Sequence, residues 1–72
     1  MEERKQIVLD WLKEKDTLVP TVDVYKGVSK IDETYHPFEV TDILEDLYRK
    51  NLVERDDGIF GFNTKWVYIR SS

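Results

Sequence analysis

The stretch PFEVTDILEDLYRKNLVER, residues 37–55, joins a helix pattern directly to a strand pattern. Its apolar residues recur at one-turn spacing, at Val40, Ile43, Leu44 and Leu47. That spacing predicts an amphipathic helix over residues 37–50. Pro37 suits the first turn, because its missing N–H would have no helical partner there. Asn51 can adopt the left-handed conformation that ends a helix, so we expect the chain to pass at once into a strand over residues 52–56.

The sequence downstream of this stretch predicts the second half of a β-hairpin. Asp56-Asp57-Gly58 is a turn signal, and residues 65–70 are rich in β-branched and aromatic side chains. The loop between them carries Phe60 and Phe62. Folding back onto the core is the favoured interpretation of these two rings, and an exposed apolar patch is the alternative.

Two further helices are expected upstream. Ile7, Val8, Trp11 and Leu12 form one apolar stripe, which predicts a helix over residues 2–15. Residues 18–19 could form a short strand, with Pro20 at an edge or a terminus because it cannot donate to a ladder. Thr21 is then a candidate N-cap for a helix over residues 22–29. That segment also fits a strand, and Gly27 weakens the helix interpretation.

The order of helix, short strand, two helices and hairpin predicts one α+β domain over residues 1–72. It resembles a winged helix-turn-helix of the generic core found in the MarR, ArsR and PadR regulators. The residues that carry the resemblance are Val40, Leu44, Leu47, Asn51, Leu52, Val53 and Arg55. The connection over residues 29–36 is longer than the usual tight turn. The resemblance implies binding to double-stranded DNA, with the third helix in the major groove and the loop 56–65 acting as the wing.

The charge of the chain argues against DNA binding. The chain has 72 residues and a formal net charge of −4, whereas affinity for DNA comes largely from Lys and Arg at phosphates. The outer face of helix 37–50 is mostly acidic, and like charge repels it from the phosphates beside the groove. The acidic residues in question are Glu39, Asp42, Glu45 and Asp46.

Two functional hypotheses follow. In the first, a non-enzymatic transcription regulator that is expected to form a homodimer contacts phosphates through Lys26, Lys30, Lys65 and Arg70 and bases through Thr41 and Arg49. In the second, a protein-interaction module docks a partner on its acidic helix face (Glu39, Asp42, Glu45, Asp46) or on Phe60 and Phe62. An ordinary solvated surface is the favoured interpretation of the scattered basic residues, and a modest patch that contacts phosphates is the alternative.

Catalytic and metal chemistry have little support in the sequence. The chain has no cysteine, which excludes disulfides and thiolate metal sites. Asp32, Glu33 and His36 have near-helical spacing, but a polar connection explains them better than a metal site. We find no nucleophile–base motif and no phosphate loop, so we expect no enzyme, cofactor or metal. No apolar run is long enough to span a membrane, and a cytoplasmic location is expected.

Overall fold

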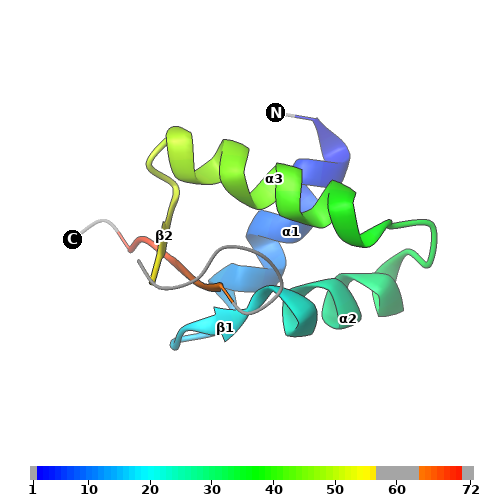
Figure 1. Ribbon diagram of the computed structural model, residues 1–72, viewed down its shortest axis with the longest axis horizontal. Helices are drawn as coiled ribbons and strands as arrows, with labels where there is room; N and C mark the ends of the chain where they lie inside the picture. The colour runs from blue at the N-terminus through cyan, green and yellow to red at the C-terminus, as the bar shows by residue number, and fades with distance from the viewer. Residues whose placement is uncertain (1, 57–63, 71–72) are drawn as a thin grey trace.

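The computed structural model describes residues 2–56 and 64–70 and confirms the predicted α+β architecture. Three helices pack against a small antiparallel sheet (Figure 1). The elements in chain order are α1 (Glu3–Lys13), β1 (Val19–Pro20), α2 (Thr21–Ile31), α3 (Pro37–Arg49), β2 (Val53–Arg55) and β3 (Lys65–Tyr68). Within the described residues, no helix is long and apolar enough to cross a membrane.

The sheet has the order β1-β3-β2, so β3 is its central strand. Trp66 of β3 lies opposite Val19 on one side and opposite Arg55 on the other. The predicted strand 18–19 is displaced by one residue, because Pro20 pairs with Lys65 as the last residue of β1. An edge strand tolerates this proline because its missing N–H interrupts no interior ladder.

The core lies where the three helices meet the sheet. The predicted apolar stripe of α3 is buried, with Val40, Leu44 and Leu47 fully inaccessible to solvent. Ile43 of α3 belongs to the same cluster, which also draws residues from every other helix and strand: Val8, Leu9, Leu12, Val19, Val24, Val28, Val53 and Trp66, together with Tyr35 from the connection after α2. The apolar spacing read from the sequence therefore identifies most of the core.

Helix α2 is longer than the predicted range of 22–29, and Gly27 lies within it. A Cβ atom added at Gly27 would collide with the indole ring of Trp11 on α1. The glycine therefore lets α1 and α2 approach each other closely. The helix keeps this residue, which has low helix propensity, because the packing of Trp11 requires it.

The prediction of Thr21 as an N-cap is wrong. Pro20 occupies the cap position, and Thr21 is the first residue of α2. The Thr21 hydroxyl is buried, donates to the Thr64 carbonyl (2.9 Å) and accepts from the indole Nε1–H of Trp66 (2.7 Å). A buried indole N–H needs an acceptor, and Thr21 supplies it across the domain.

The end of α3 is a Schellman motif. Asn51 has a φ of 61°, as predicted for the residue that ends this helix. The Asn51 N–H donates to the Tyr48 carbonyl and the Leu52 N–H donates to the Leu47 carbonyl, both at 3.0 Å. These two bonds satisfy carbonyls that the last turn leaves unpaired. Because Leu52 belongs to this cap, β2 begins at Val53 instead of at the predicted residue 52.

The remaining boundaries differ from the predictions by one or two residues. Helix α1 covers residues 3–13 instead of 2–15, and α3 ends one residue before the predicted residue 50. Strands β2 and β3 end at Arg55 and Tyr68, whereas residues 56 and 70 were predicted. The predicted turn at residues 57–58 and the two phenylalanines, Phe60 and Phe62, lie outside the described residues.

Candidate nucleic-acid interface

Helix α3 presents one exposed ridge on the side away from the core. Its members recur at helical spacing: the exposed Phe38, Asp42 and Arg49 and the half-buried Glu45. Phe38 is the most exposed large apolar residue described, at 67%, and its ring stacks on that of His36 with centroids 5.7 Å apart. The ridge therefore combines an aromatic ring, two carboxylates and one guanidinium.

Glu39 lies on the flank of α3 that faces α1, and it is held there by Arg4. The Arg4 guanidinium donates to both carboxylate oxygens, at 2.6 and 2.7 Å, and lies 4.2 Å from the centroid of the Tyr35 ring. The hydrogen bond from Arg4 lowers the pKa of Glu39, although partial burial of the carboxylate opposes the shift. The Glu39 carboxylate also accepts from the His36 N–H, and His36 Nδ1 accepts from the Phe38 N–H, which caps the start of α3.

Asp46 is held by two lysines on the same flank of α3. Its carboxylate contacts Lys50 at 2.9 Å and Lys5 of α1 at 3.1 Å. Hydrogen bonds from Lys50 and then from Lys5 lower the pKa of Asp46. Two of the four predicted acidic docking residues, Glu39 and Asp46, are therefore neutralised within the domain, whereas Asp42 and Glu45 have no ion-pair partner among the described residues.

The long connection between α2 and α3 is folded against α1. The Asp32 carboxylate accepts from the backbone N–H and the hydroxyl of Thr34, and these bonds lower the pKa of Asp32. The Tyr35 hydroxyl donates to the Arg4 carbonyl at 2.6 Å. These contacts give Asp32 and Tyr35 a structural role in the connection. The described part of the chain contains no group of three or more His, Cys, Asp or Glu side chains that could hold a metal ion.

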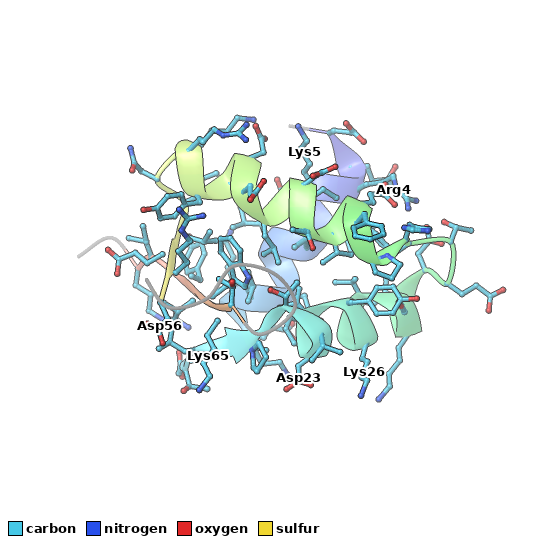
Figure 2. All side chains as sticks on the ribbon, in the orientation of Figure 1. Arg4, Lys5, Asp23, Lys26, Asp56 and Lys65 are labelled. Carbon is cyan, nitrogen blue, oxygen red and sulfur yellow. The ribbon has the colours of Figure 1, made fainter. Side chains whose placement is uncertain are left out.

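Five of the six predicted DNA-contacting residues are exposed basic residues, and four of these five are not bound by a carboxylate of the described residues. Lys26, Lys30, Arg49 and Lys65 have no ion pair to any described residue. Lys26 and Lys30 lie one turn apart on α2, and Lys65 begins β3. Figure 2 shows Lys26 and Lys65 along one edge of the molecule, where Asp23 and Asp56 also lie. That edge carries both signs of charge, and Arg4 and Lys5 lie at the opposite edge of the same view.

The other two predicted DNA-contacting residues have partners inside the domain. Arg70 donates to the Asp16 carboxylate (2.5 Å) and to the Lys13 carbonyl (2.8 Å), at the end of α1. The Thr41 hydroxyl donates to the Pro37 carbonyl one turn earlier in α3, at 3.2 Å. Arg70 would have to give up Asp16 in order to reach a phosphate.

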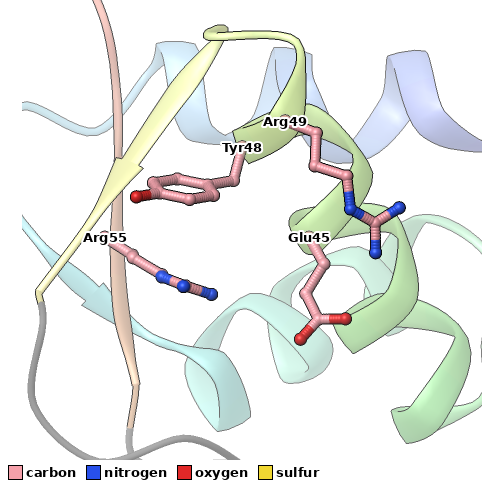
Figure 3. A pocket seen from close by; sticks show the side chains of 4 residues that line it. All are labelled: Glu45, Tyr48, Arg49 and Arg55. Atoms are coloured by element: carbon pink, nitrogen blue, oxygen red, sulfur yellow. The ribbon is translucent and has the colours of Figure 1, made fainter.

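A surface pocket of about 270 Å³ lies between the last turns of α3 and strand β2, lined by Glu45, Tyr48, Arg49 and Arg55. Figure 3 shows Arg55 extending from β2 toward α3, beside the ring of Tyr48. Sequence reasoning did not select Arg55 or Tyr48 as site residues. The alternation of side chains along β2 could have pointed to Arg55. Arg55 lies two residues after the buried Val53, so both side chains lie on the same side of the strand.

Comparisons with known proteins reveal a fold similarity but no family. No family model and no curated protein matches the chain. A solved structure of HOP2 superposes with a TM-score of 0.75 at 17% identity, covering 90% of this chain and 97% of that one. That structure is described as giving insight into the DNA recognition and protein interaction domains of HOP2 and into its homologous DNA pairing properties. The similarity shows that this chain folds as a winged helix, whereas kinship with MarR, ArsR or PadR regulators stays a prediction.

Proposed function

We propose that this winged helix binds duplex DNA mainly through phosphate contacts and has a regulatory, non-enzymatic role. The observation that carries the proposal is the distribution of unpaired charge. Lys26, Lys30, Lys65 and Arg49 have no ion-pair partner among the described residues, whereas Glu39 and Asp46 of α3 are bound by cations of the same domain. The net charge of −4 therefore overstates the repulsion between α3 and a phosphate backbone.

Base reading is expected to be weak. Asp42 and Glu45 on the ridge can accept a hydrogen bond from an exocyclic amino group, cytosine N4 or adenine N6, and Arg49 can donate to guanine. The Thr41 hydroxyl is already engaged with the Pro37 carbonyl. The domain therefore has few groups that discriminate between base pairs, and most of its affinity should be independent of sequence.

A salt-dependent titration tests this function. Binding to a fluorescent random-sequence duplex is measured by anisotropy at several salt concentrations. Four phosphate-neutralising cations should give a slope of log K against log salt of about −3 to −4. Each of the variants Lys26→Gln, Lys30→Gln and Lys65→Gln should reduce the magnitude of that slope by about 0.9.

Lys15→Gln is the matched control, because the Lys15 ammonium lies over the Trp11 ring on α1 at 4.7 Å from its centroid. It removes the same charge and should leave the slope unchanged. Absence of binding at low salt and high protein concentration would contradict the function. An equal loss of slope in the control and the three variants would contradict the proposed surface.

A protein-interaction role is the second candidate, and the exposure of Phe38 favours it. The ring is 67% exposed and shares its ridge with Asp42 and Glu45. An aromatic anchor beside unpaired carboxylates fits a partner that is both apolar and basic. A helical peptide with leucine on one face and lysine on its flanks is the probe. Under this candidate Phe38→Ser weakens capture of the peptide at least tenfold, whereas unchanged capture by the variant rejects the ridge as the docking surface.

The predicted homodimer belongs to the same proposal. Paired winged helices place two recognition helices on successive turns of a duplex. Sedimentation velocity with and without duplex DNA measures the assembly, and a complex with a single protein chain at saturation would exclude the dimer.

A further inference from the structure

We propose that the pocket formed by Glu45, Tyr48, Arg49 and Arg55 is a phosphate-binding site that takes one backbone phosphodiester of DNA. This inference rests on the proposed function and extends it to residues of β2. The pocket brings together two guanidinium groups from different elements, Arg49 from the end of α3 and Arg55 from β2. Guanidinium groups bind phosphate oxygens with paired N–H donors, which makes arginine the common residue at such sites.

Arg55 is held in position by a chain of aromatic contacts. Its guanidinium carbon lies 4.3 Å from the centroid of the Tyr48 ring, and the Tyr48 ring packs edge-on against Trp66 with centroids 6.4 Å apart. Trp66 is buried and hydrogen-bonded to Thr21. A guanidinium stacked on an anchored ring has lost part of its side-chain entropy before a ligand arrives, which favours binding.

Glu45 sets the charge of the site. Two guanidiniums and one carboxylate line the pocket, so its formal charge is +1. A backbone phosphodiester carries one negative charge, whereas a phosphorylated side chain carries about −1.5 to −2 near neutral pH. The pocket therefore matches DNA backbone better than it matches a phosphopeptide.

The position of the pocket agrees with the proposed binding mode. Glu45 and Arg49 belong to the exposed ridge of α3, and Figure 3 shows Arg55 pointing from β2 toward that helix. A phosphate bound here would lie beside the ridge. The site would then fix how far α3 enters the groove, which is the role of phosphate contacts in general.

The charge of Glu45 provides the sharpest test. Glu45→Gln removes the one carboxylate from the pocket and should strengthen binding to a random-sequence duplex roughly threefold at low salt, as expected for a unit charge a few ångströms from a phosphate in water. Glu54→Gln is the matched control, because Glu54 is the exposed residue of β2 that precedes Arg55 and lies on the other side of the strand. The control should change affinity much less, and an equal gain in both variants would overturn the proposal.

The arginines provide a second, independent measurement. Arg55→Gln should weaken duplex binding and reduce the magnitude of the salt slope by about 0.9. Arg55→Lys should keep the slope, since the charge remains, but bind more weakly because the paired donors are lost. In the Arg49→Gln/Arg55→Gln background, the gain from Glu45→Gln should disappear. A gain that persists in this background, with both variants folded in a thermal melt, would place the phosphate elsewhere.

Failure of the pocket is distinguishable from failure of the function. If the wild-type domain binds duplex DNA but Glu45→Gln and Arg55→Gln leave affinity and slope unchanged, only the pocket is rejected. If the wild-type domain binds no duplex, the function is rejected, and dimethyl phosphate then probes the pocket by the NMR shifts of the arginine Nε–H groups. Saturable shifts that Arg55→Gln abolishes would support the site. Absence of shifts, or tighter binding of a phosphoserine peptide than of dimethyl phosphate, would overturn it.

Discussion

At the scale of single residues, Gly27 shows how a position can contradict its own local preference. A glycine within a helix is destabilising by roughly 0.5–1 kcal/mol relative to alanine, and this one sits in the middle of α2. The Trp11 ring occupies the space that a Cβ atom would need. The packing of α1 on α2 therefore outweighs the helix propensity of the residue.

We expect Gly27→Ala to destabilise the domain by about 1–3 kcal/mol, the usual range for overpacking a tight contact. Urea denaturation followed by Trp fluorescence measures the change in free energy of unfolding. Ser29→Ala on the same helix is the control, because the buried Ser29 hydroxyl has no hydrogen-bond partner among the described residues. That variant should be neutral or slightly stabilising, and a stabilising Gly27→Ala would contradict the predicted collision.

At the scale of elements, α3 is fastened to α1 along its acidic flank. Arg4 binds Glu39, and Lys5 binds Asp46. The same guanidinium contacts the connection after α2 at Asp32 and Thr34. These are partly exposed contacts, so each adds modest stability. Their larger consequence is that they remove negative charge from the surface of the helix that is expected to face DNA.

The Arg4–Glu39 pair predicts a loss of stability in acid. The pKa of Glu39 in the folded state is lowered from its usual value of 4.5 by the hydrogen bond from Arg4. Its contribution is therefore fully present above pH 4.5 and is lost as the pH falls through the lower folded-state pKa. Glu39→Gln should lower the free energy of unfolding near pH 7. It should also make that free energy depend less steeply on pH below about pH 5.

Urea midpoints measured between about pH 3 and pH 7 check this prediction. Asp42→Asn is the matched control, since it removes one charge from α3 without breaking an ion pair within the described residues. The control should follow the wild-type curve. A Glu39→Gln variant with the full wild-type acid dependence would show that this pair does not contribute to stability.

At the scale of the whole molecule, some basic residues of this acidic chain are bound by its own carboxylates and others are not. The basic residues that bind carboxylates of the same chain are Arg4, Lys5, Lys13, Lys50 and Arg70. The exposed lysines of α2 and β3 lie elsewhere on the surface (Figure 2). A protein with negative net charge can bind DNA when its uncommitted cations share one side.

This arrangement predicts that duplex DNA stabilises the folded state only at low salt. A ligand at a hundred times its Kd adds about 2.7 kcal/mol, and a domain of this size gains about 4–8 °C in Tm for each kcal/mol. Saturating duplex should therefore raise Tm by about 10–20 °C at low ionic strength and by almost nothing at high salt. The triple variant Lys26→Gln/Lys30→Gln/Lys65→Gln should lose most of the increase. A salt-independent rise would contradict phosphate binding.

The sequence by itself determined the features that depend on residues within one or two helical turns. The burial of the α3 stripe, the stop at Asn51 and the start at Pro37 were all predictable. The exposure of Lys26, Lys30 and Arg49 follows from the helical period of α2 and α3, and that of Lys65 from the alternation of β3. Each of these depends on neighbours that the chain places nearby in any folded state.

Only the tertiary structure decided which polar groups are engaged and which remain available. Thr21 accepts a hydrogen bond from Trp66, 45 residues away, and Arg4 donates to Glu39, 35 residues away. Arg70 reaches back 54 residues to Asp16. Sequence spacing contains no information about such pairs, because the packing of α1 on α3 and of β3 on β1 brings them together. The same long-range packing joins Arg55 to Tyr48, so the phosphate pocket could be proposed only once β2 had been placed beside α3.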